Sequence, residues 1–427
     1  MELIVLFGTF IFLLLLGVPI AVTLGGSAMA TVVYMDIPPM IVFQRMASGM
    51  NVFSLMAIPF FIYAGELMQH GGISERLVKL ANAMIGHIRG GLGLVNVLSS
   101  MLFGGISGSA VADVSALGST LIPMMKEKGY DPDYAVNVTV TSATIGLIVP
   151  PSHNMIIYSI AAGGTVSVSA LFMAGFIPGI LSGLSLMVAT YLVAIKRGYP
   201  RETFPGFKTL ILLFAHALPG LMTAIIIIGG VLSGIFTATE SAAIAVIYAL
   251  FVTGFFYRSL KWKNFVAATL GAVKTTAMVL LIIGTAASFA WLLALNQVPD
   301  RLFMLLQTIS DNPLVIMLMV NVILLFLGTF MDMSPLIIIC TPIFLPVMTQ
   351  LGMDPVQFGI VLMVNLGIGL VTPPVGSVLF VGCAVGNVKM EDTTRTIWPF
   401  YLVMVITLLL VTYIPAISMF VPNILIN

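Results

Sequence analysis

Apolar runs of about 20 residues, the length an α-helix needs to cross a bilayer core, fill most of this chain. Of its 427 residues, 59% are hydrophobic and only 8% are charged. A water-soluble fold cannot bury so large an apolar fraction. The runs also lack the alternation of polar and apolar residues that is typical of membrane barrel strands. We therefore predict an all-α polytopic membrane protein.

Two of these runs are interrupted by a glycine that is followed by two prolines. The first reads IGLIVPP at 145–151 and the second IGLVTPP at 368–374. Proline removes a backbone donor and disfavours helix at the residue before it. Irregular backbone is tolerated at membrane depth only where protein or a water-filled cavity covers it. We predict two broken transmembrane helices, over 134–162 and 356–385, whose unwound carbonyls can coordinate a small cation near the midplane.

The two breaks belong to an internal repeat. Residues 121–152 align with residues 344–375 without a gap, so that Pro123 corresponds to Pro346 and Pro150 to Pro373, always 223 positions later. Upstream, GGISGS (104–109) meets GTFMDM (328–333) and SERLVKL (74–80) meets PDRLFML (299–305) with small slips. We predict homologous halves at 51–205 and 276–427. Residues 1–50 and 206–275 are then additional scaffold helices.

Charges at equivalent positions indicate that the two halves have opposite orientations. Lys126 and Lys128 correspond to uncharged residues in the second half, whereas Lys389 and Arg395 correspond to uncharged residues in the first. Since cytoplasmic loops are enriched in lysine and arginine, each half is basic where the other is neutral. We predict an inverted-topology repeat, which many secondary transporters have.

Basic residues on both sides of 91–125 predict that this segment enters and leaves the membrane on one face. It would form a re-entrant helical hairpin that turns near SGSA (107–110). Its counterpart, 313–348, would turn near MDMSP (331–335) and enter from the opposite face. Each hairpin tip would lie opposite one break. We expect two pseudo-symmetric ion sites with a substrate site between them.

Polar side chains at the tips and breaks are the candidate ligands. The hydroxyls of Ser107 and Ser109 suit sodium, and helix N-capping is a role that competes with ligation or coexists with it. Asp332, beside the second tip, is either a functional carboxylate or the cap of a helix that begins near Ser334. At the second break, Thr372 is a candidate ligand, for which bonding back to its own helix is the alternative.

Candidate substrate contacts are Asp113, Thr144, Asn154 and Ser334. For Thr144 the alternative is again a hydrogen bond to its own helix, and for Asn154 a structural role. Glu66 and Glu240 are interpreted as helix-end or interhelical bonding groups.

Five motifs together resemble the large membrane subunit of tripartite ATP-independent periplasmic (TRAP) transporters. They are IPFFIYAGELM (58–68), FGGISGSAVAD (103–113), GLIVPPS (146–152), GIFTATESAA (234–243) and GLVTPP (369–374). The resemblance covers essentially the whole chain. It implies an elevator-type fold, similar to the ion transporter superfamily, in which outer helices hold a mobile domain that carries both hairpins.

The resemblance also implies sodium-coupled uptake of a small organic acid, such as a C4-dicarboxylate or sialic acid, across the bacterial inner membrane. The expected partners are a periplasmic binding protein and a small four-helix membrane subunit, which we expect as a separate chain because nothing precedes MELIVLFG. Sodium is the only expected cofactor, and no nucleic acid is expected. One implied sodium site comprises Gly105, Ser107, Ser109, Gly146 and Val149. The other comprises Gly328, Asp332, Gly369 and Thr372.

Two other functions are compatible with a polytopic membrane protein. A stand-alone sodium–dicarboxylate symporter would share the hairpins, but its tips usually read Ser-Asn-Thr, and neither SGSA nor MDMS does. A membrane enzyme would need a nucleophile–base pair or a metal cluster, and the sequence shows neither, so a non-enzymatic transporter subunit is favoured.

Overall fold

The computed structural model describes residues 1–425, apart from the side chains of Ile106 and Ser107. The described residues form the helices α1 to α22 with short 3-10 and π-helical segments, and they contain no strand. Five helices are long and apolar enough to cross a membrane, or up to seven if each of two bent pairs counts as one span. The predicted all-α class is therefore confirmed.

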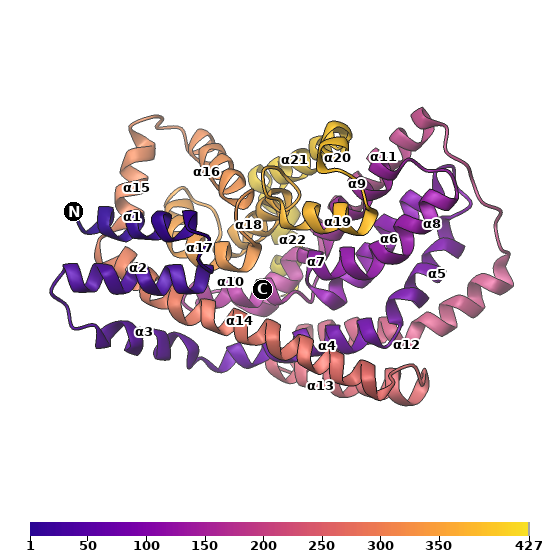
Figure 1. Cartoon of the computed structure of the whole chain (residues 1–427), viewed down its shortest axis with the longest axis horizontal. Coiled ribbons are helices and arrows are strands. Elements are labelled where there is room, and N and C mark those ends of the chain that lie inside the picture. The colour runs from indigo at the N-terminus through magenta and orange to yellow at the C-terminus, as the bar shows by residue number, and fades with distance from the viewer. Residues whose placement is uncertain (426–427) are drawn as a thin grey trace.

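An outer group of helices packs around α14, the longest helix (Figure 1). Helices α2, α3 and α4 contact α14, while α4 also contacts α13, which packs on α12. The predicted boundary at 275/276 falls inside α14, which is continuous, so the second half of the repeat shares a helix with the outer group. The outer elements are α1 (Glu2–Leu15), α2 (Ile20–Tyr34), α3 (Met40–Met50), η1 (Phe53–Met56), α4 (Ala57–His70), α12 (Phe207–Leu232), α13 (Ala238–Leu250), η4 (Phe251–Phe256) and α14 (Trp262–Leu295).

Two helical hairpins are present at the predicted places. In each, the helices before and after a short turn pack against one another. Whether they re-enter a membrane remains a prediction. The first consists of α6 (Gly91–Ser107), α7 (Ala110–Asp113), η2 (Val114–Gly118) and α8 (Ser119–Glu127), and the second of α16 (Pro313–Gly328) and α17 (Met333–Gln350).

Both predicted helix breaks are also present. The first helix ends at Leu147 and resumes at His153, and the second ends at Gly369 and resumes at Ser377. Each break contains a cis Pro–Pro bond, at Pro150–Pro151 and Pro373–Pro374. The elements are α9 (Pro132–Ala143), η3 (Thr144–Leu147) and α10 (His153–Ala161), then α18 (Pro355–Gly369) and α19 (Ser377–Gly386).

The half-helix after each break packs on the opposite repeat. Helix α10 contacts α17 of the second hairpin, and α19 contacts α9 and η2 of the first repeat. Gly382 permits the second contact, because a Cβ at this position would lie 2.1 Å from Val140 Cγ1. The two repeats thus interlock into one inner body. Helix α11 (Val168–Arg197) packs along this body with α21 (Trp398–Tyr413) and α22 (Pro415–Leu425).

Two short helices follow the outer spans at equivalent places. Helix α5 (Ile73–Ile85) follows α4, and α15 (Val298–Gln307) follows α14. They contain the segments SERLVKL and PDRLFML that the repeat aligned. Helix α5 buries an apolar face that includes Leu77, Val78 and Ala81, whereas α15 buries Leu306. The remaining short helix is α20 (Met390–Thr396).

Buried asparagines tie each hairpin to the broken helix of its own repeat. Asn96 on α6 donates from Nδ2 to Thr139 Oγ1 on α9 at 2.6 Å. In the second repeat, Asn365 on α18 donates to Asn321 Oδ1 on α16 at 2.8 Å. A buried amide left unpaired would cost about 1–3 kcal/mol, so these bonds hold hairpin and broken helix in one register.

Candidate functional site

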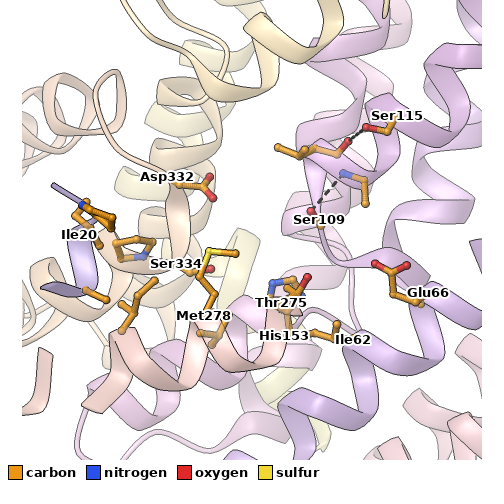
Figure 2. Close-up of a pocket in the computed structure, with 18 of the residues that line it drawn as sticks. Ile20, Ile62, Glu66, Ser109, Ser115, His153, Thr275, Met278, Asp332 and Ser334 are labelled. Carbon is orange, nitrogen blue, oxygen red and sulfur yellow. Dashed lines mark hydrogen bonds between the residues drawn. The ribbon is translucent and has the colours of Figure 1, made fainter. Parts of the chain in front are cut away.

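A cavity of about 580 Å³ separates the inner body from the outer helices. Figure 2 shows Ser109, Ser115 and Glu66 along one side of it and Asp332 and Ser334 along the other. The outer group contributes residues of α4 and α14 and the start of α2, and the inner body contributes the two hairpin tips and the start of α10. Both predicted tips therefore border one central space, as a substrate site between two ion sites requires.

The first hairpin tip packs across the first helix break where Gly104 meets Gly146, and we call this contact the first crossing. A Cβ on Gly146 would lie 2.6 Å from Gly104 Cα, and one on Gly104 would lie 2.3 Å from Gly146 Cα. Next to this pair, a Cβ on Gly105 would lie 2.8 Å from the carbonyl oxygen of Pro150. Because Pro150 has no N–H, the Gly146 carbonyl lacks its helical partner four residues later. Backbone oxygens therefore gather at this crossing.

The second tip crosses the second break in the same way. A Cβ on Gly369 would lie 2.6 Å from Gly328 Cα. The carbonyl of Gly369 accepts a bond from Thr372 N at 3.0 Å and keeps its second lone pair. At the end of the break, Gly376 N donates to Thr329 O of the tip at 3.2 Å. Both crossings are thus built from glycine pairs that no side chain can enter.

One carboxylate lies near each tip, but from different positions in the two repeats. A Cβ on Gly146 would lie 3.0 Å from Asp113 Oδ2, so this buried carboxylate borders the first crossing. At the second tip, Asp332 holds the N-cap position of α17 without a side-chain capping bond. Its Oδ1 instead accepts from Ser377 Oγ at 3.5 Å. Each crossing thus offers hard oxygen donors, carbonyls with a nearby carboxylate, which suit sodium.

The other predicted ion-site residues have the following places. Val149 lies beside Gly105, with its Cγ1 3.3 Å from a Cβ built there. Ser109 is the N-cap of α7, accepting from Ala112 N at 3.4 Å, and it also lines the cavity, while its role as a sodium ligand stays a prediction. Thr372 donates to Ile368 O at 2.7 Å, which is the back-bonding alternative. The side chain of Ser107 lies outside the described part of the chain.

The four predicted substrate contacts fall into three groups. Ser334 lines the cavity. Asn154 lies behind the tips, where it bonds to Gly108 O. Asp113 and Thr144 are not among the cavity-lining residues: Asp113 borders the first crossing, and Thr144 donates to Thr141 O on its own helix at 2.7 Å. For these two, the structure favours roles in the inner body over substrate contact.

Sequence reasoning missed Glu66 as a site residue. Its carboxylate lines the cavity from α4, 3.5 Å from His70 Nδ1. The signal was an acidic residue within an apolar helix. Glu240, by contrast, forms a capping box with Thr237, which confirms its predicted helix-end role.

The cavity is acidic. Its ionisable lining residues are Glu66, His153 and Asp332, and no lysine or arginine lies among the described residues around it. An organic anion in this cavity is therefore repelled by the carboxylates of Glu66 and Asp332, and no lysine or arginine among the described lining residues offsets that repulsion.

Comparison with known proteins identifies the family. A family model described as "Tripartite ATP-independent periplasmic transporter, DctM component" matches residues 7–417. The chain belongs to this family. As a DctM component it is a multi-pass membrane subunit of a transporter, and the resemblance noted in the sequence is confirmed.

Curated relatives extend over nearly the whole DctM component. It is 42% identical over 99% of its length to the uncharacterised protein YgiK of Salmonella typhimurium, covering 97% of that protein. It is 37% identical to the C4-dicarboxylate TRAP transporter large permease protein of Rhodobacter capsulatus, with both chains fully covered. It is 39% identical to the sialic acid TRAP transporter large permease protein of Vibrio cholerae, covering 89% of this chain and 88% of that one.

A solved structure has a similar fold. The crystal structure of the Alcanivorax borkumensis YdaH transporter superimposes with a TM-score of 0.63 and covers 87% of each chain, at 15% sequence identity. At this identity the likeness concerns the fold alone. It shows that the helical architecture of this DctM component also occurs in a protein of very different sequence.

Proposed function

We propose that this DctM component is the membrane pathway for sodium-coupled uptake of a small organic acid across the bacterial inner membrane. In this proposal a periplasmic binding protein delivers the substrate, and a small membrane subunit completes the transporter. The substrate class is that of the relatives named for C4-dicarboxylates and sialic acid.

The observation that carries sodium coupling is the acidic cavity between two oxygen-rich crossings. An anion 4 Å from a carboxylate is repelled by about 4 kcal/mol at an effective dielectric constant of 20. The inner body offers carbonyls and a carboxylate at each tip, where bound cations would offset this repulsion. Substrate binding would then depend on cation binding, which is the basis of coupled transport.

The chain's own residues would divide the work as follows. The glycine crossings would hold sodium through backbone oxygens, with Asp113 at the first and Asp332 at the second. The substrate would bind between the tips, against Ser109 and Ser334. The inner body would then move past α4 and α14 as an elevator, because the cavity is lined by both groups and belongs to neither alone.

Reconstituted transport tests this function. The DctM component and its small partner subunit are placed in proteoliposomes, and uptake of sialic acid and of a C4-dicarboxylate is measured. Each substrate is tested with and without its binding protein and an inward sodium gradient, with potassium as the control cation. We expect uptake only when sodium and the binding protein are both present.

Two other outcomes would contradict the proposal in different ways. Uptake driven by sodium without a binding protein would indicate a stand-alone symporter, which the family membership does not favour. Uptake that is equal in sodium and potassium would remove sodium coupling while leaving the transporter assignment intact.

A further inference from the structure

The two hairpin tips are joined by one buried side chain. Asn154, in the first turn of α10, is 2% exposed. Its Nδ2 donates to Gly108 O in the first tip at 3.1 Å. Its Oδ1 accepts from Ser334 Oγ, in the second tip at the start of α17, at 3.3 Å. The amide of Asn154 thus bonds to both hairpin tips, which are more than 200 residues apart in the sequence.

The chemistry of the two partners fixes the orientation of this amide. A backbone carbonyl can only accept a hydrogen bond, so the NH₂ group of Asn154 must face Gly108. The carbonyl end of the amide then faces Ser334, whose hydroxyl is able to donate. Both bonds are therefore made only when the two tips stand in one relative position.

The equivalent residue of the second repeat makes no such link. Ser377 lies 223 positions after Asn154 and also begins the half-helix that follows a break. Its hydroxyl donates to Asp332, in the tip of its own repeat. The residues of the first tip that correspond to Ser334, Ala110 and Val111, have no hydroxyl with which to complete a second link. Among the described side chains, the link that Asn154 makes between the tips therefore has no counterpart at Ser377.

We infer that Asn154 is a positioning residue that couples the two tips, so that ordering of one tip favours the bound geometry of the other. The packing of α10 on α17 supports this role, because α10 carries Asn154 and α17 belongs to the second hairpin. The inference rests on the proposed sodium coupling and adds to it that the two sites act cooperatively through one amide.

A cysteine at the second tip reports its ordering without measuring transport. Phe330 is 46% exposed in this tip, whereas the native thiols of Cys340 and Cys383 are buried. The labelling rate of Phe330→Cys by a maleimide is measured in purified protein over a series of sodium concentrations at constant ionic strength. We expect sodium to slow labelling with a Hill coefficient above 1. Its upper limit is about 2, the number of proposed sodium sites.

Two variants remove the link from either end. In Asn154→Ala and in Ser334→Ala we expect the Hill coefficient to fall to about 1 and the half-protecting sodium concentration to rise about fivefold or more. Ser334→Ala leaves the bond of Asn154 to Gly108 in place and so tests the link even if Asn154→Ala folds poorly. The double variant should be no worse than the single ones, because both remove the same connection.

Ser377→Ala is the matched control, since it removes a bond to the second tip alone. It should shift the half-protecting concentration and keep the steep curve. Three results would overturn the inference while leaving sodium-coupled uptake intact. They are a Hill coefficient that stays above 1 in Ser334→Ala, an equal fall of the Hill coefficient in Ser377→Ala, and a Hill coefficient of 1 in the Phe330→Cys background. If neither the labelling rate nor uptake depended on sodium, the proposed function itself would be overturned.

Discussion

At the scale of single residues, the carboxylates of Glu66 and Asp332 line the central cavity. Asp332 stands at a helix N-cap without a side-chain capping bond, lines the cavity and accepts a long bond from Ser377. Charged groups in a membrane segment are costly and usually face a cavity or a partner. An acidic residue in this position is therefore better explained by cation binding than by helix stability.

The first prediction concerns this carboxylate. In Asp332→Asn we expect the sodium concentration that half-activates uptake to rise at least about tenfold, because losing a charged ligand costs about 1.5–3 kcal/mol. Uptake is measured in proteoliposomes over a sodium series. Asp311→Asn, which changes an exposed loop carboxylate, is the control and should keep the original dependence. An unchanged sodium dependence in Asp332→Asn would remove this residue from the second site.

At the scale of elements, the glycine crossings set how closely a hairpin approaches its broken helix. Gly104 meets Gly146, and Gly328 meets Gly369, with backbone against backbone. The buried asparagines Asn96 and Asn365 fix the same pairs of elements in register. Close approach and fixed register together bring the backbone oxygens of each break near a tip.

The second prediction tests a crossing. Gly146→Ala places a methyl group 2.6 Å from Gly104 Cα, where neither backbone can easily yield. We expect a loss of stability of about 1–3 kcal/mol from overpacking, together with weaker sodium activation of uptake. Gly229→Ala, in α12, has no atom within 4 Å of the new Cβ and should be neutral or slightly stabilising. Thermal unfolding in detergent compares the two, and equal melting temperatures would argue against a tight crossing.

At the scale of the whole molecule, the orientation of the chain decides which face the cavity serves. Gln69 lines the cavity in the last turn of α4, just before the basic residues Arg76 and Lys79 of α5. Basic segments are enriched on the cytoplasmic side. Ser54 lies near the opposite end of Phe53–His70, the second helix of a bent pair, and lines a separate cavity of about 320 Å³ between α10 and α14.

The third prediction follows from this orientation. A membrane-impermeant maleimide should label Gln69→Cys in inside-out vesicles and Ser54→Cys in right-side-out vesicles. The buried native cysteines Cys340 and Cys383 provide an unreactive background. Reaction of Gln69→Cys only from the periplasmic side would contradict this prediction. Either the chain would then have the opposite orientation, or the central cavity would open to the periplasm.

Much of the architecture was determined by the sequence itself. Hydropathy, proline chemistry and the constant spacing of the repeat predicted an all-helical membrane protein, its two breaks and its two hairpins, because these signals are local in the chain. The family resemblance named Gly146, Gly328 and Gly369 of the two crossings, but it named Gly105 where the structure pairs Gly104 with Gly146. The repeat boundary at 275/276 could not be, because sequence similarity does not show that α14 continues through it.

Only the tertiary structure decided what several polar side chains face. Asp113 borders the first crossing, Thr144 bonds to its own helix, Glu66 reaches the cavity, and Asn154 joins the two tips. The direction of a side chain depends on which distant helix packs beside it. The two repeats interlock through the contacts of α10 with α17 and of α19 with α9. These contacts determine which helix each side chain faces, and no local sequence pattern predicts them.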